Sequence, residues 1–147
     1  MLRHPSRWFL ATVATAALLV GTVAASQSTP SITFQSPSQG WNVFPSSNPL
    51  PYGQTAAIIY DASRLTTCRG DYMGNPGWSI YAYYKWNNGP VQPAIWVAGA
   101  KPYATVPPPS IPLNTRGDLA IWFENTSRWG CQGWDSNYGN NFHFNVQ

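Results

Sequence analysis

Charge is scarce in this chain. Only 9% of its 147 residues are Asp, Glu, Lys or Arg. Residues 26–147 hold six Lys or Arg and five Asp or Glu, which leaves a net charge of +1. Neutralising the phosphates of a nucleic acid requires a dense stripe of Lys and Arg. We therefore expect no nucleic-acid partner.

Cysteine is nearly absent as well. Cys68 and Cys131 are the only two; their number excludes a zinc site and their spacing excludes a C-x-x-C redox site. In an exported protein such a pair predicts one disulfide, with two free buried thiols as the alternative. The bridge would close a long loop, for which the chain-entropy model gives roughly 4 kcal/mol of stability.

The groups that enzymes use are also sparse. His143 is the only histidine after residue 25, and no G-x-S-x-G, H-E-x-x-H or glycine-rich nucleotide motif occurs. Asp118 and Glu124 share a strand face, but six residues of extended chain separate them by about 20 Å. Glycosidase carboxyl pairs lie roughly 5 to 10 Å apart. We expect no enzymatic activity and no cofactor; a small hydrolase using Asp135 or Glu124 with His143 ranks last among the alternatives.

One apolar run stands at the start of the chain. "WFLATVATAALLVGTVAA", residues 8–25, follows Arg3 and Arg7 and ends in small residues. A basic start, an apolar middle and a small-residue cleavage site are typical of a signal peptide. We predict a signal peptide at 1–25 and a secreted protein, periplasmic or extracellular. An uncleaved anchor is the alternative, and membrane contact is expected only through this segment.

After the signal, no window shows sustained helical periodicity. Residues 26–54 form a Ser/Pro-rich N-terminal segment, with one possible strand at 31–35. Short alternating or β-branched runs then follow, separated by turn residues such as "NNG". The predicted strands are 55–61, 77–86, 93–99, 117–126 and 141–147, with the proline-rich segment 104–114 at an edge. We predict an all-β domain at 55–147, an antiparallel β-sandwich with an immunoglobulin-like two-sheet architecture.

Aromatic residues, in contrast, are abundant: they make up 15% of the chain. Strand alternation places Tyr81, Tyr83 and Trp122 opposite the apolar face that carries Ile80 and Ile121. Exposed rings beside amide groups suit neutral, polyhydroxylated ligands, because the ring packs on sugar C–H groups while the amides bind hydroxyls. The candidate carbohydrate-binding rings are Trp122, Trp129, Trp134 and Tyr138.

The segment "DSNYGNN" also resembles the start of a calcium loop. However, Gly139 stands at the fifth position, and no bidentate Glu follows at the twelfth. We expect no metal site. These residue types are typical of a tight turn between strands, with Gly139 at positive φ.

"DLAIWFENTSRWGCQGWDSNYGNNFHF", residues 118–144, resembles the last hairpin of starch- and glycogen-binding modules. These modules occur on glucoamylases and amylases and in glycogen-targeting phosphatase subunits. Their pattern, W-D-N-N-x-G-x-N-Y, is matched from Trp134 to Phe142, with Ser136 in place of Asn and Phe142 in place of Tyr. The whole chain also resembles a small group of exported bacterial proteins that carry this tail.

The resemblance implies a non-enzymatic β-sandwich that binds α-glucans, with Trp134 as an aromatic contact and Asn137 and Asn141 as amide contacts. We therefore expect a secreted protein that binds a polysaccharide or oligosaccharide through an aromatic platform. A structural or protein-interaction component of the cell envelope or extracellular matrix is the alternative.

Overall fold

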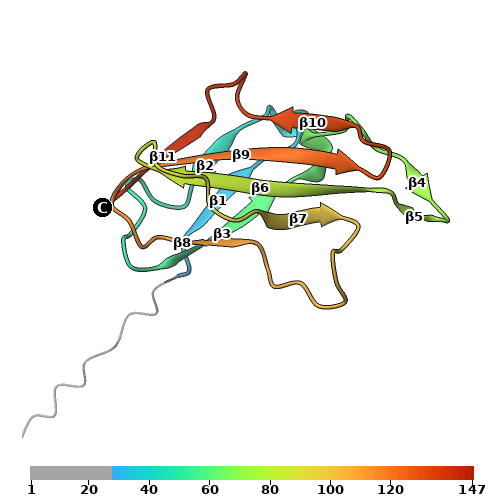
Figure 1. Ribbon diagram of the computed structural model, residues 1–147. Helices are drawn as coiled ribbons and strands as arrows, with labels where there is room; N and C mark the ends of the chain where they lie inside the picture. Colours follow the sequence, from blue (N-terminus) through green and yellow to red (C-terminus); the bar gives the residue numbers. More distant parts are fainter. Residues whose placement is uncertain (1–27) are drawn as a thin grey trace, which may run out of the picture.

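The computed structural model describes residues 28–147 (Figure 1). The predicted signal peptide, residues 1–25, lies outside this part of the chain. Within the described part, no helix has the length and hydropathy needed to cross a bilayer. The only helical segments there are two 3-10 turns, η1 (Pro37–Gln39) and η2 (Ala62–Arg64). The predicted all-β class is confirmed for residues 28–147.

The first sheet has four strands, in the order β2-β1-β3-β8. Their bounds are Val43–Pro45, Ser31–Phe34, Thr55–Tyr60 and Ser110–Pro112. The pair β1–β3 is parallel, so the expectation of a wholly antiparallel arrangement is wrong for this pair. Parallel pairing requires a long connection, and residues 35–54, which include β2, supply it.

The second sheet has five strands and is organised around β9 (Gly117–Ser127). β6 (Trp78–Trp86) lies along one side of β9, and β7 (Ile95–Gly99) lies beyond β6. On the other side, β11 (Phe142–Val146) pairs with the first half of β9 and β10 (Gln132–Asp135) with the second. The chain between β10 and β11 therefore leaves the sheet edge and returns to it.

A third, two-stranded sheet forms a hairpin from β4 (Asp71–Tyr72) and β5 (Asn75–Pro76). It projects from the end of the molecule far from the C-terminus (Figure 1). The predicted disulfide is confirmed: Cys68 and Cys131 are joined, with their Cα atoms 5.4 Å apart. This bond ties the start of the hairpin to the turn between β9 and β10.

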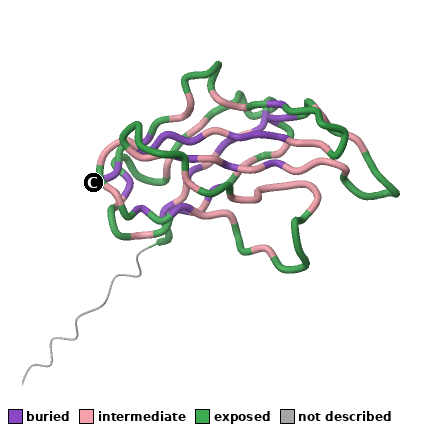
Figure 2. The backbone as a smooth tube through the Cα atoms, viewed as in Figure 1, coloured by how far each residue is buried: buried purple, intermediate pink, exposed green. Residues whose placement is uncertain are grey.

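The core lies between the two larger sheets, where buried segments are concentrated (Figure 2). The predicted inward faces of 77–86 and 117–126 are correct, since Ile80 and Ala82 are buried, as are Leu119, Ile121 and Phe123. β10 was not among the predicted strands, and it overlaps the predicted turn, residues 135–141, only at Asp135. The turn begins only after Asp135, because residues 132–135 pair with Phe123 to Thr126.

The segment before residue 55 is part of the same packed unit. Ile32, Phe34 and Leu50 are fully buried in the common core, and β1 and β2 belong to the first sheet. The packed domain therefore begins no later than Ser31, rather than at residue 55. Apolar residues spaced among serines and prolines thus form the edge strand β2 and the inner strand β1.

Candidate ligand-binding surfaces

The β10–β11 turn, residues 136–141, projects from the edge of the second sheet (Figure 1). Asn137, Tyr138, Gly139 and Asn141 all have positive φ, at 48°, 56°, 88° and 61°. This confirms the prediction for Gly139. The backbone N–H of Asn141 donates to the Ser136 carbonyl at 2.7 Å, and Asn137 Nδ2 donates to the Asn141 carbonyl at 3.2 Å. The Asn137 amide thus holds the turn, while its oxygen stays available.

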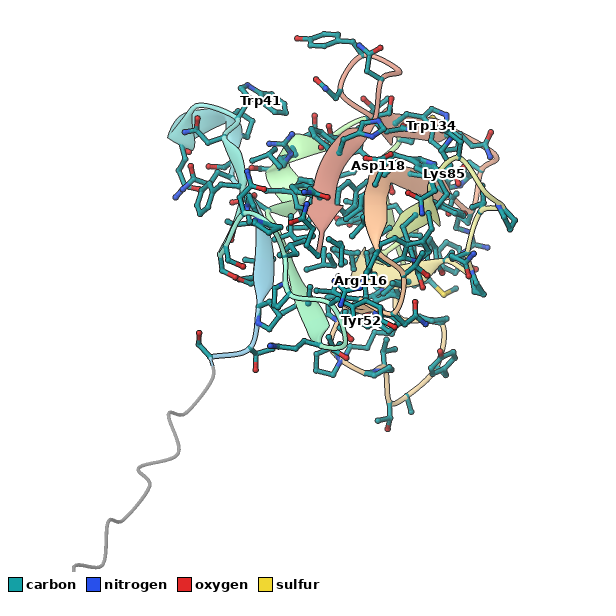
Figure 3. The ribbon with its side chains drawn as sticks, turned by 90° about the vertical axis from the view of Figure 1, so that its left-hand side faces the viewer. Trp41, Tyr52, Lys85, Arg116, Asp118 and Trp134 are labelled. Atoms are coloured by element: carbon teal, nitrogen blue, oxygen red, sulfur yellow. A yellow bond between two sulfur atoms is a disulfide. The ribbon has the colours of Figure 1, made fainter. Side chains whose placement is uncertain are left out.

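A cavity of about 430 Å³ lies between this turn and the loop that carries Trp41. We call it the Trp41–Trp134 cleft. Both indoles are about half exposed, at 50% and 53%. Both are labelled in the upper part of Figure 3, Trp41 toward the left and Trp134 toward the right, on different elements. The other lining residues are Arg64, Asp135, Ser136, Asn137, Tyr138 and Phe142.

A buried ion pair, Arg64 with Asp135, lies at the base of the cleft. Arg64 Nε lies 2.7 Å from Asp135 Oδ2, and the two side chains are only 3% and 11% exposed. Arg64 Nη1 donates to the carbonyls of Gln35 and Trp41, at 2.8 and 3.1 Å. The Tyr60 hydroxyl donates to Asp135 Oδ2 at 2.9 Å. Burial, followed by the Asp135 charge, raises the pKa of Tyr60, so this hydroxyl remains a donor.

Aromatic rings enclose the same guanidinium. Arg64 Cζ lies 5.1 Å from the centroid of the Trp41 ring and 5.5 Å from that of Phe142, within cation–π range. The cation is thereby covered by rings and neutralised by Asp135. An ionic ligand would find no unpaired opposite charge at the base of the cleft. The arrangement favours a neutral ligand that can stack on indoles.

A second aromatic surface covers the outer face of β6 and β9. Tyr83 and Trp122 are opposite each other in register, and their rings are stacked with centroids 5.9 Å apart. Glu124, 5% exposed, accepts a hydrogen bond from Gln132 Nε2 at 2.8 Å. Burial, then the hydrogen bond to Glu124, raises the pKa of Tyr83 to about 12. The Tyr83 hydroxyl and the Glu124 carboxylate therefore interact beside the stacked rings.

The structure brings together some of the predicted site residues and separates others. Trp134, Asn137 and Tyr138 line the cleft. Trp134 lies opposite Glu124 in register, so Trp122 is its diagonal neighbour on β9. Asn141 contributes the backbone of the turn and does not line the cleft. Trp129 lies elsewhere, against Gly70 and Gly77 beside the β4–β5 hairpin.

Trp41 and Arg64 are cleft residues that sequence reasoning missed.

Trp41 gave no signal in the sequence. It lies in a Ser/Pro-rich segment with no periodic pattern, so nothing in its neighbourhood indicated a place in the fold. Its φ of 60° is uncommon for a bulky residue. The backbone is held in this conformation by a bond from its N–H to the Ser36 carbonyl and by the Arg64 bond to its own carbonyl.

The groups considered for catalysis are engaged separately. His143 Nδ1 lies 2.8 Å from Asp118 Oδ1, and Nε2 lies 2.9 Å from the Asn140 carbonyl. The hydrogen bond to Asp118 raises the pKa of His143. Asp135 is paired with Arg64, and Glu124 with Gln132. Among residues 28–147, no three His, Cys, Asp or Glu side chains gather to hold a metal ion.

A larger cavity, about 620 Å³, lies beside the β4–β5 hairpin. We call it the hairpin groove. Tyr72, Met73, Trp78 and Arg128 line it together with small and hydroxyl-bearing residues. Arg128 Cζ lies 3.2 Å from the centroid of the Tyr72 ring, and Arg69 Cζ lies 4.1 Å from that of Trp78. Arginine meets aromatic rings here too, but without a carboxylate.

Asn125 belongs to the sequence Asn-Thr-Ser, which is a glycosylation acceptor where the source glycosylates. Its side chain is fully buried, and Nδ2 donates to the Thr67 carbonyl at 2.6 Å. Asn125 Oδ1 is a buried oxygen without a hydrogen-bond partner among the described residues. The folded domain therefore does not present this amide for modification.

Comparison with known proteins places the chain in a family without assigning it an activity. No curated protein and no solved structure matches it. One family matches over residues 29–147, from just before β1 to the last residue, and no carbohydrate-binding module is identified by the comparison. The chain belongs to this family, DUF6209, a family of unknown function.

Proposed function

We propose that this protein is an exported, non-catalytic carbohydrate-binding protein whose ligand is a neutral glucan of the starch or glycogen type. The two larger sheets, packed through one core, would act as an immunoglobulin-like β-sandwich that holds the Trp41–Trp134 cleft in place. The disulfide fits an oxidising compartment outside the cytoplasm.

The observation that carries the proposal is a cleft whose own charges are already paired and whose lining includes two half-exposed tryptophans. The cleft volume falls within the roughly 300 to 1,000 Å³ range of small-ligand sites. Ring faces can pack on sugar C–H groups, while Asn137, Ser136 and Tyr138 offer hydrogen-bonding groups at the rim. The uncommon backbone conformation of Trp41 adds support, because strained residues concentrate at functional sites.

Electrophoresis in native gels that contain glycogen or soluble starch tests the proposal. The wild-type protein should be retarded, and Trp41→Ala and Trp134→Ala should each weaken retardation about tenfold, because a large ring no longer packs on the ligand. Trp129→Ala is the matched control, since this indole is 56% exposed but lies by the hairpin. It should leave retardation unchanged. Absence of retardation by any neutral polysaccharide would overturn the proposal.

A protein-interaction role is the second candidate, and one observation favours it. Phe44 and Ile59 are 45% and 53% exposed, and both flank Thr33 on the outer face of the first sheet. Adjacent exposed apolar side chains are typical of protein contacts. Sedimentation velocity of the wild type and of Ile59→Lys distinguishes this role from glucan binding. Self-association that Ile59→Lys abolishes, together with no retardation in glycogen gels, would support the protein-interaction role.

A further inference from the structure

We propose that the hairpin groove is a second ligand site, one that takes the carboxylate of a uronic acid residue in an acidic polysaccharide. Its central group is the Arg128 guanidinium. Arg128 directly follows β9, and its backbone N–H donates to the Gly77 carbonyl at 2.9 Å, so its position is fixed relative to β5 and β6. The Tyr72 ring covers one face of the guanidinium.

The hydrogen-bonding edges of Arg128 are free. Among the described residues, its side chain has no hydrogen-bond acceptor and no carboxylate partner, and it stacks on the Tyr72 ring. An arginine that is held by stacking and keeps its N–H donors free presents a planar fork that matches a carboxylate. Because the ring already orients the guanidinium, less side-chain entropy is lost when an anion binds.

The local charge is positive. Arg69 and Lys101 are exposed near the same groove, Arg69 stacked on Trp78 and Lys101 directly after Ala100, which lines the cavity. Neither lies within ion-pair distance of a carboxylate in residues 28–147. The Arg69 guanidinium donates to the carbonyls of Leu65 and Ala62 and interacts electrostatically with Asp61, so Arg69 adds charge near the groove but is not a direct ligand contact. Asp71 is the nearby acid in sequence, but it does not line the groove, and strand alternation points it away from the face of Tyr72.

The rest of the lining indicates a sugar acid rather than a simple ion. The hydroxyl-bearing residues Ser79, Thr126 and Ser127 line the groove together with Met73 and Pro76. Ser79 Oγ donates to the Ala100 carbonyl and Ser127 Oγ accepts from two backbone N–H groups, so Ser79 can still accept and Ser127 can still donate to a sugar hydroxyl. Ser79 and Thr126 are opposite each other on the outer face of β6 and β9, the face that carries Tyr83 and Trp122. The groove therefore opens onto a surface along which a chain of sugar residues can continue.

The chain itself offers a matched control. Arg116 and Arg128 flank the two ends of β9, and each lies over a tyrosine ring, Arg116 over Tyr52 at 4.2 Å. The Arg116–Tyr52 pair appears in Figure 3. Arg116 lines neither of the two cavities. Substitution of either arginine by lysine leaves the net charge unchanged, and each substituted residue lies next to one end of β9.

Calorimetric titration of the full domain with an oligogalacturonate tests the inference. The wild type should bind, Arg128→Lys should bind at least about tenfold more weakly because an ammonium cannot form the two-pronged contact, and Arg116→Lys should match the wild type. Tyr72→Leu should weaken binding as well, since it removes the stacking that orients Arg128. Raising the ionic strength should weaken binding of all variants.

Several outcomes would overturn the inference: equal binding by Arg128→Lys, an equal loss in Arg116→Lys, or binding to vesicles that contain an anionic phospholipid but not to the oligogalacturonate. The inference does not depend on the proposed glucan cleft. Arg128→Lys should retain wild-type retardation in glycogen gels, and Trp41→Ala should retain oligogalacturonate binding, so failure of one proposal is distinguishable from failure of the other.

Discussion

The Trp41–Trp134 cleft and the hairpin groove both combine arginine with aromatic rings, yet they treat the charge in opposite ways. Arg64 is buried and bound by Asp135 and two carbonyls, whereas Arg128 is exposed and stacked on Tyr72 with its donors free. A buried cation must be paired because desolvation is costly. An exposed one can stay unpaired. The same residue type is thus a structural element in one site and, in our proposal, a ligand contact in the other.

Removal of the Asp135 charge should produce the largest effect. Asp135→Asn leaves Arg64 buried without its carboxylate, and we expect a loss of about 3 to 5 kcal/mol in the free energy of unfolding. Urea denaturation measures this loss. Asp118→Asn, at the more exposed His143 pair, is the control and should cost less than about 1 kcal/mol. Equal losses in the two variants would show that burial does not make the Arg64–Asp135 pair more important for stability than the exposed pair.

The disulfide is the next largest contribution. A double substitution, Cys68→Ser with Cys131→Ser, should lower the free energy of unfolding by about 4 kcal/mol, since the closed loop is long. The effect should be greatest at the hairpin groove, because the bond ties the β4–β5 hairpin to the β9–β10 turn. Hydrogen exchange should increase more at residues 68–77 than at 136–141. Uniform loss of protection would contradict this local role.

Substitution of the exposed arginine should have a much smaller effect. Arg128→Gln removes a stacking contact at the surface and should change the free energy of unfolding by less than about 1 kcal/mol. Thermal or urea denaturation of this variant beside Arg64→Gln tests the contrast directly. Comparable destabilisation by the two substitutions would mean that Arg128 is structural and not reserved for a ligand.

His143 should give the smallest effect, and it concerns the turn that lines the cleft. Both ring nitrogens face acceptors, so the protonated ring satisfies Asp118 and the Asn140 carbonyl together. Its pKa is raised in the folded protein. The stabilisation is therefore complete below the unfolded pKa of about 6.5 and is lost as pH rises through the higher folded pKa. Because the pair is exposed, solvent screening keeps the gain well below about 1 kcal/mol.

An NMR titration of the His143 ring protons measures this shift. The midpoint should lie above about 6.5 in the wild type and should fall in Asp118→Asn, which removes the main cause of the shift. Amide protection of residues 136–141 should decrease over the same pH range. A midpoint at or below the reference value would contradict the double contact.

The strands that alternate most regularly were the ones that sequence analysis identified. "WSIYAYYKW" became β6 and "GDLAIWFENTS" became β9, each with the predicted face inward. β2, β4, β5 and β10 were not predicted, because each is only two to four residues long and rich in turn-forming or polar types. Such short strands form because a partner strand is already present, and a local pattern does not record that partner.

The candidate site also contains residues that the sequence indicated and residues that only the fold brings together. The turn of residues 136–141 follows from its Asn and Gly residues, which accept positive φ. Trp134 was assigned from its neighbours in the sequence, and it lies in the cleft as a consequence of the β9–β10 pairing. Trp41 and Arg64 reach the same cleft from the other sheet. Their approach depends on packing across the core and on the hydrogen bonds of the Arg64 side chain.

The sequence alone determined the all-β class, the inward faces of the long strands, the single disulfide and the low charge, because composition and period-two alternation are local properties. Only the tertiary structure decided the parallel β1–β3 pair, the membership of residues 31–54 in the core, and the separation of Trp129 from Trp134. It also decided which arginine is neutralised and which stays free. The physical reason is that desolvation and pairing depend on groups distant in the chain, and these meet only after folding.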